Sequence, residues 1–138
     1  KEIIYTYLQK LLRTDYLGNG IEPSYYKIEI NTDYLTIHKT IYDVIIPELI
    51  YNLKKYTPIK QIDKNVSIII SRNEIVIENN INKFRATNKN KGEGRRMCDK
   101  ILSIYKNEKK YELDGYEIPS TEFNIYKTIL KMKDNERT

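Results

Sequence analysis

The feature that most limits how this chain can fold is a pair of short runs rich in β-branched residues. Val66 to Ser71 reads Val-Ser-Ile-Ile-Ile-Ser, and Ile75 to Ile77 reads Ile-Val-Ile. Only Arg72-Asn73-Glu74 separates the two runs. Segments of this length and composition favour strands, and so short a connection joins antiparallel neighbours. The sequence therefore predicts a β-hairpin, against which the rest of the chain must pack.

Three segments have the apolar spacing of helices. The first is Lys1 to Arg13, whose stripe consists of Ile3, Ile4, Tyr7, Leu8, Leu11 and Leu12. The second is Ile37 to Tyr56, with Ile41, Val44, Ile45, Leu49, Asn52 and Leu53 on one side. The third is Arg95 to Tyr105, with Met97, Ile101, Leu102 and Tyr105 facing inward. Pro47 interrupts the second segment, so this helix is either kinked there or starts afresh with the proline in its first turn.

Three further strands are expected outside the hairpin. Tyr25 to Ile30 alternates apolar and polar residues, and Lys110 to Leu113 and Glu122 to Leu130 form a second pair turning at Asp114-Gly115. The polar stretch from Asn79 to Lys91 has few apolar anchors and predicts a mobile loop. The resulting order predicts an α+β protein, a two-layer α/β sandwich with a mixed sheet and helices on one face.

Length and composition indicate one folded domain. The chain has 138 residues, of which 40% are hydrophobic and 31% charged, as expected for a globular protein. No apolar run approaches the roughly 20 residues of a membrane span, so we expect a cytoplasmic domain. Such a domain is either a separate protein or the cytoplasmic part of a membrane-bound one. Residues 1–14 are expected to form a separate N-terminal helix, and residues 15–138 the main domain. This helix is either the remnant of a dimerisation helix or a packing helix of the domain.

With a single cysteine and a single histidine, the chain has few residues for a disulfide, a zinc site or a cysteine nucleophile. Cys98 cannot form an internal disulfide, and one Cys with one His cannot complete a usual zinc site. They could form a nucleophile–base pair, but no third orienting group is suggested nearby. The net charge of +5 suggests an anionic partner, yet the basic residues are dispersed over several segments. A basic, tyrosine-rich nucleic-acid binder is therefore a weaker alternative, without strong support from the sequence.

Two segments have residues suited to a nucleotide. Glu48 and Asn52 lie four residues apart, so they share one face of the second helix. An Asn carbonyl on such a face suits Mg²⁺, which prefers oxygen ligands. Alternatively, the pair is an exposed pair on an amphipathic helix. Lys91-Gly92-Glu93-Gly94-Arg95-Arg96 places two glycines and several cations before a helix, where free amides attract anions.

The order of these segments resembles the ATPase domain shared by gyrase, the ninety-kilodalton heat-shock chaperone, mismatch-repair proteins and histidine kinases. Glu48-Leu-Ile-Tyr-Asn52-Leu-Lys-Lys55-Tyr56 resembles the N-box of that family, E-x-x-x-N-A-x-K-Y. Gly92-Glu-Gly94 resembles its second glycine box, and the preceding polar loop takes the place of the ATP lid. The final hairpin, with Phe123, Ile125 and Ile129, resembles the closing strands. The resemblance covers about residues 25–130 and implies the Bergerat-type ATP-binding fold.

The resemblance implies roles for particular residues. Asn52 would coordinate Mg²⁺, and Glu48 would be the catalytic acid that polarises water or assists an accepting histidine. Lys55 would approach a phosphate and Tyr56 would stack on adenine. The remaining residues implied to bind ATP are Asn79, Gly92, Gly94 and Arg95.

The implied function is an ATP-binding catalytic domain of a sensor histidine kinase or a related ATPase, with Mg²⁺ and ATP as cofactors. In a kinase the partner is a domain carrying the phosphoacceptor histidine, and preceding helices would form a homodimer. His38 lacks the H-[ED]-x-x-x-P context of such an acceptor. Asn79-Asn80-Ile81 stands where the family has Asp-x-Gly, which favours the alternative of an inactive member acting through protein contacts.

Overall fold

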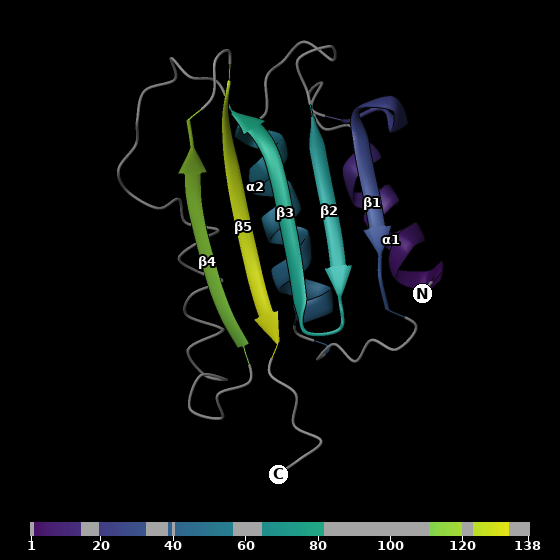
Figure 1. Cartoon of the computed structure of the whole chain (residues 1–138). Helices are drawn as coiled ribbons and strands as arrows, with labels where there is room; N and C mark the ends of the chain where they lie inside the picture. Colours follow the sequence, from purple (N-terminus) through teal and green to yellow (C-terminus); the bar gives the residue numbers. More distant parts are fainter. Residues whose placement is uncertain are drawn as a thin grey trace.

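The computed structural model describes residues 2–14, 20–32, 39, 41–56, 65–81, 111–119 and 123–132. It has an α+β architecture in which helices α1 (Glu2–Arg13) and α2 (Ile46–Tyr56) lie on the same side of a five-stranded sheet (Figure 1). The strands are β1 (Tyr26–Ile30), β2 (Val66–Ser71), β3 (Glu74–Ile81), β4 (Tyr111–Ile118) and β5 (Asn124–Met132). In the described parts of the chain, no helix is long and apolar enough to cross a membrane.

The sheet is mixed, and its strand order is β1-β2-β3-β5-β4. Strands β1 and β2 are parallel, whereas every other neighbouring pair is antiparallel. The predicted hairpin is confirmed, because β2 and β3 pair antiparallel around Arg72-Asn73. The crossover between the two parallel strands determines the direction of α2. A helix linking adjacent parallel strands returns from the end of the first to the start of the second.

The helix-facing side of the sheet forms the core. Alternate residues of the central strands point toward the helices, among them Ile68 and Ile70 on β2 and Ile75 and Ile77 on β3. Helix α1 buries Ile4, Leu8 and Leu12 against this layer. Ile3 was predicted on the same stripe, but it is 78% exposed, since its position lies just beyond the contact face.

An aromatic contact fixes α1 against the segment that precedes α2. The rings of Tyr7 and Tyr42 stack with centroids 4.3 Å apart, and the Tyr7 hydroxyl donates to the Tyr42 carbonyl oxygen over 3.0 Å. Burial, followed by the nearby charges of Tyr42 and Asp43, raises the pKa of Tyr7 above its usual value. The contact ties the first helix to the start of the second.

The predicted helix from Ile37 to Tyr56 is divided at Pro47. Residues Ile41–Ile45 form a π-helical turn, and α2 begins at Ile46 with the proline as its second residue. Proline lacks the amide that would continue the preceding helical hydrogen bonds, so a widened turn is accommodated before it. The proline therefore lies in the first turn of α2, as one of the two interpretations expected, and the π-helical turn joins α2 without an intervening residue.

Two strand boundaries correct the sequence predictions. Strand β3 continues to Ile81, so the predicted loop does not begin at Asn79; Asn79 and Ile81 extend the inward alternation and pair with β5. Asp114 and Gly115 lie in the middle of β4, because that strand runs on to Ile118. The predicted helix at residues 95–105 and most of the predicted loop lie outside the described residues.

Candidate functional site

Helix α2 has two polar side chains on one face. Glu48 lies in its first turn, and Asn52 lies one turn later. Both side chains are partly buried, and neither has a hydrogen bond or ion pair with another described residue. A carboxylate and a carboxamide that share one helix face and reach solvent are free to contact a ligand, so this pair is a candidate ligand site.

The topology brings the second half of α2 and Asn79 to the same end of the sheet. The crossover requires α2 to end near the start of β2, where Val66 is the partner of Asn79 on β3. The amide of Ile21, shortly before β1, donates to the Leu12 carbonyl at the end of α1. That helix end is in turn bonded to Lys54. These contacts agree in placing the last turns of α2 beside the starts of β1 and β2.

Asn79 is a buried polar residue of the core side. It is 3% exposed, and it follows Ile75 and Ile77 in the inward alternation of β3. Its Nδ2 donates to the carbonyl oxygen of Asn80 over a long 3.3 Å. Because a buried carboxamide needs hydrogen-bond partners and this bond is long, Asn79 is suited to a ligand that offers a better hydrogen bond.

The other predicted ATP-binding residues are only partly described. Lys55 is exposed near the end of α2, and Tyr56 is the last residue of that helix. The side chain of Tyr56, like Gly92, Gly94 and Arg95, lies outside the described part of the structure. Glu48, Asn52, Lys55 and Asn79 are therefore the four predicted residues that can be placed.

Lys54 has a structural role that the sequence interpretation did not assign. It is 6% exposed, and its Nζ donates to the carbonyl oxygens of Leu11 and Thr14, each over 2.8 Å. A cation at a helix C-terminus satisfies the free carbonyl groups there and opposes the helix dipole. Its spacing from Ile46 and Ile50 is the signal that could have identified it, since steps of four place all three residues on the buried stripe.

Asn124 and Glu117 are a second pair that the interpretation missed. Asn124 Nδ2 donates to Glu117 Oε2 over 3.4 Å between β5 and β4. Asn124 is opposite Ile81 in the β3–β5 register, so its side chain belongs to the helix-facing side. Counting back from buried Leu130 in steps of two reaches Asn124, and this alternation could have identified it as an inward polar residue.

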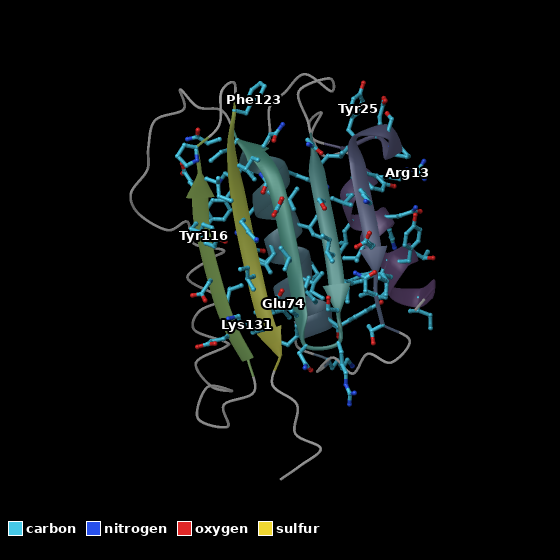
Figure 2. All side chains as sticks on the ribbon, viewed as in Figure 1. Arg13, Tyr25, Glu74, Tyr116, Phe123 and Lys131 are labelled. Carbon is cyan, nitrogen blue, oxygen red and sulfur yellow. The ribbon has the colours of Figure 1, made fainter. Side chains whose placement is uncertain are left out.

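The face of the sheet opposite the helices is mixed in charge. Figure 2 shows Glu74, Tyr116 and Lys131 on this side. Its acidic residues are Glu29, Glu74, Glu78, Glu112 and Asp114, and its basic residues are Lys27, Lys127 and Lys131. Two of the lysines lie 3.7 Å from Glu29 and Glu78. Within the described strands, this face is not the contiguous basic surface that nucleic-acid binding predicts.

The oxygen ligands that α2 offers fit a magnesium ion that is held mainly by phosphates. No group of three His, Cys, Asp or Glu residues suited to a metal occurs among the described residues. Magnesium bound to a nucleotide keeps several waters and needs only one or two protein oxygens. The unpaired carboxamide of Asn52 can supply one such oxygen.

Comparison with known proteins gives no further assignment. No protein-family model matches this chain, and no curated protein is similar to it.

Proposed function

We propose that this chain is an ATP-binding domain of the histidine kinase-like ATPase class, with a Bergerat-type fold. The observation that supports it most is the position of Asn52. This side chain is partly buried on α2, is unpaired among the described residues, and lies at the end of the sheet where Asn79 is buried. The element order of the described chain also agrees with the resemblance, because the N-box-like segment forms a helix and is followed by a hairpin and closing strands.

The proposed role of each residue follows from its side-chain chemistry. Asn52 supplies an oxygen to Mg²⁺, and the exposed ammonium group of Lys55 approaches a phosphate. Glu48, one turn from Asn52, polarises an attacking water or assists an accepting histidine on another domain. Phosphoryl transfer needs mainly such positioning and charge neutralisation.

Thermal unfolding with and without Mg-ATP tests this proposal. Nucleotide at a hundredfold excess over its Kd stabilises the folded state by about 2.7 kcal/mol. The shift is expected to disappear in Asn52→Ala and to persist in Asn31→Ala. Asn31 is a matched control, since it is an exposed asparagine just after β1, at the opposite end of the sheet. The absence of any shift in the parent protein at millimolar Mg-ATP would refute the proposal.

A second function is favoured by one specific observation. Asn79 replaces an acid by a neutral carboxamide, so the site lacks the negative charge expected to anchor adenine. In this second function the domain is a catalytically inactive member of the same fold, and it acts in signalling through protein contacts. Release of phosphate, or labelling of an acceptor histidine, in the presence of bound Mg-ATP would exclude this alternative.

A further inference from the structure

Two carboxamides lie on the helix-facing side of the sheet at the end proposed to hold nucleotide. In the β3–β5 register, Ile81 is opposite Asn124 and Asn79 is opposite Tyr126. Asn79 and Asn124 are therefore diagonal neighbours on the same face of the sheet. Val66 and Ile81, both buried, provide the apolar surface beside them. Apolar walls with a few placed polar groups are typical of small-molecule sites.

The orientation of the Asn124 amide is determined by Glu117. A carboxylate only accepts hydrogen bonds, so the amide must present Nδ2 to Glu117 Oε2, as it does over 3.4 Å. Its Oδ1 then points away from that carboxylate. This oxygen and the Tyr26 hydroxyl are the two buried side-chain polar atoms of described residues that lack a hydrogen-bond partner.

A buried acceptor that has no protein partner is suited to a ligand that brings a hydrogen-bond donor. Leaving such an oxygen without a partner opposes folding, and native proteins usually satisfy it. Asn124 as a whole is only partly buried, although this oxygen is buried. Because Glu117 prevents the amide from reversing, the oxygen can serve only as an acceptor.

We propose that Asn124 determines the specificity of the site for the base, with its Oδ1 accepting a hydrogen bond from the exocyclic amino group of a 6-aminopurine. This inference rests on the proposed nucleotide function and specifies its ligand. A 6-oxopurine would place its own acceptor oxygen against Oδ1, and the locked amide cannot reverse to accommodate it. The site therefore selects ATP over ITP, which has the same triphosphate and sugar.

The test is calorimetric titration of the whole chain with Mg-ATP and, separately, with Mg-ITP. The parent protein is expected to prefer ATP roughly tenfold, the effect of about one hydrogen bond. Asn124→Ala is expected to bring the ratio close to one, mainly by weakening ATP. The double variant Asn124→Asp with Glu117→Gln keeps both the mutual hydrogen bond and an acceptor toward the base, so the preference should return. Asn31→Ala should retain the parent ratio.

The outcomes separate the two proposals. If both nucleotides bind and Asn124→Ala leaves their ratio unchanged, the role of Asn124 is wrong while the nucleotide function stands. If the parent protein binds neither nucleotide, the proposed function is wrong and this inference is overturned with it. Asn124→Ala removes the unpaired oxygen together with the long 3.4 Å hydrogen bond from Nδ2 to exposed Glu117, so only a small change in melting temperature is expected and the variant should stay folded for the titration. A ratio lost in Asn124→Ala but not restored in the double variant would also contradict the hydrogen-bond account.

Discussion

Replacing Lys54 by methionine should loosen α1 from the rest of the fold. Methionine keeps most of the apolar stem but loses the two 2.8 Å hydrogen bonds to the Leu11 and Thr14 carbonyl oxygens. Each bond from a charged donor is worth about 1.5–3 kcal/mol, but methionine avoids the cost of several kcal/mol that dehydrating a buried ammonium group imposes on the folded parent protein. The difference gives a net loss of about 2 kcal/mol.

This loss corresponds to a measurable change in melting temperature. An unfolding entropy of about 2.1 cal/mol/K per residue gives about 0.29 kcal/mol/K for 138 residues. Lys54→Met should therefore lower the Tm by about 7 °C in circular dichroism melts without nucleotide. Lys55→Met is the matched control, because its exposed side chain should change stability by less than about 0.5 kcal/mol. Equal melting temperatures for the two variants would refute the capping role of Lys54.

The remaining predictions concern ionisation and pairing. Because the pKa of Tyr7 is raised, the contribution of its hydroxyl to stability is fully present below pH 10 and is lost as pH rises through the raised value. Tyr7→Phe should therefore flatten the alkaline decline in the free energy of unfolding measured in urea. An unchanged decline in the variant would contradict this role of Tyr7. Asn79→Asp buries a carboxylate, so the free energy of unfolding at pH 7 should fall by about 2–4 kcal/mol and should recover as pH falls toward 4. If the variant and the parent protein were equally stable across that pH range, the side chain at this position would be hydrated. Lys127 and Glu78 form a partly exposed ion pair at 3.7 Å, so Glu78→Gln should change the free energy of unfolding by less than about 1 kcal/mol. A larger loss in denaturant melts would mean that the pair is more than a surface contact.

The elements that the sequence predicted well are those with strong local patterns. The hairpin between Val66 and Ile77 is dense in β-branched residues, and the helix from Lys1 to Arg13 has a clear helical periodicity. The existence of both is confirmed, and so are the approximate limits of the helix and of the first strand, whereas the second strand of the hairpin runs on to Ile81. The strand at residues 25–30 is confirmed for the same reason, because its alternation is short but regular.

The errors arose where tertiary pairing overrides local preference. Asn79 and Asn80 favour loops, yet β5 pairs with this segment and extends the strand to Ile81. Gly115 favours a turn, yet it faces Thr128 inside the β4–β5 ladder. Neither pairing can be derived from the sequence of a single strand.

The candidate site could be predicted only in part. Glu48 and Asn52 were identifiable because helical spacing puts them on one face, and Asn79 followed from the resemblance. The Asn124–Glu117 pair depends on the register between two strands, and Lys54 depends on where α1 ends. Both contacts are set by packing between distant segments.

Hydrogen–deuterium exchange with and without Mg-ATP tests the central claim most directly, because it locates the ligand. With Mg-ATP bound, we expect slower exchange in the second half of α2, at the end of β3 around Asn79 and at the start of β5 around Asn124. Exchange at the Arg72-Asn73 turn, at the opposite end of β3, should not change. Unchanged exchange throughout the chain at saturating Mg-ATP, or protection confined to that turn, would contradict a nucleotide site at this end of the sheet.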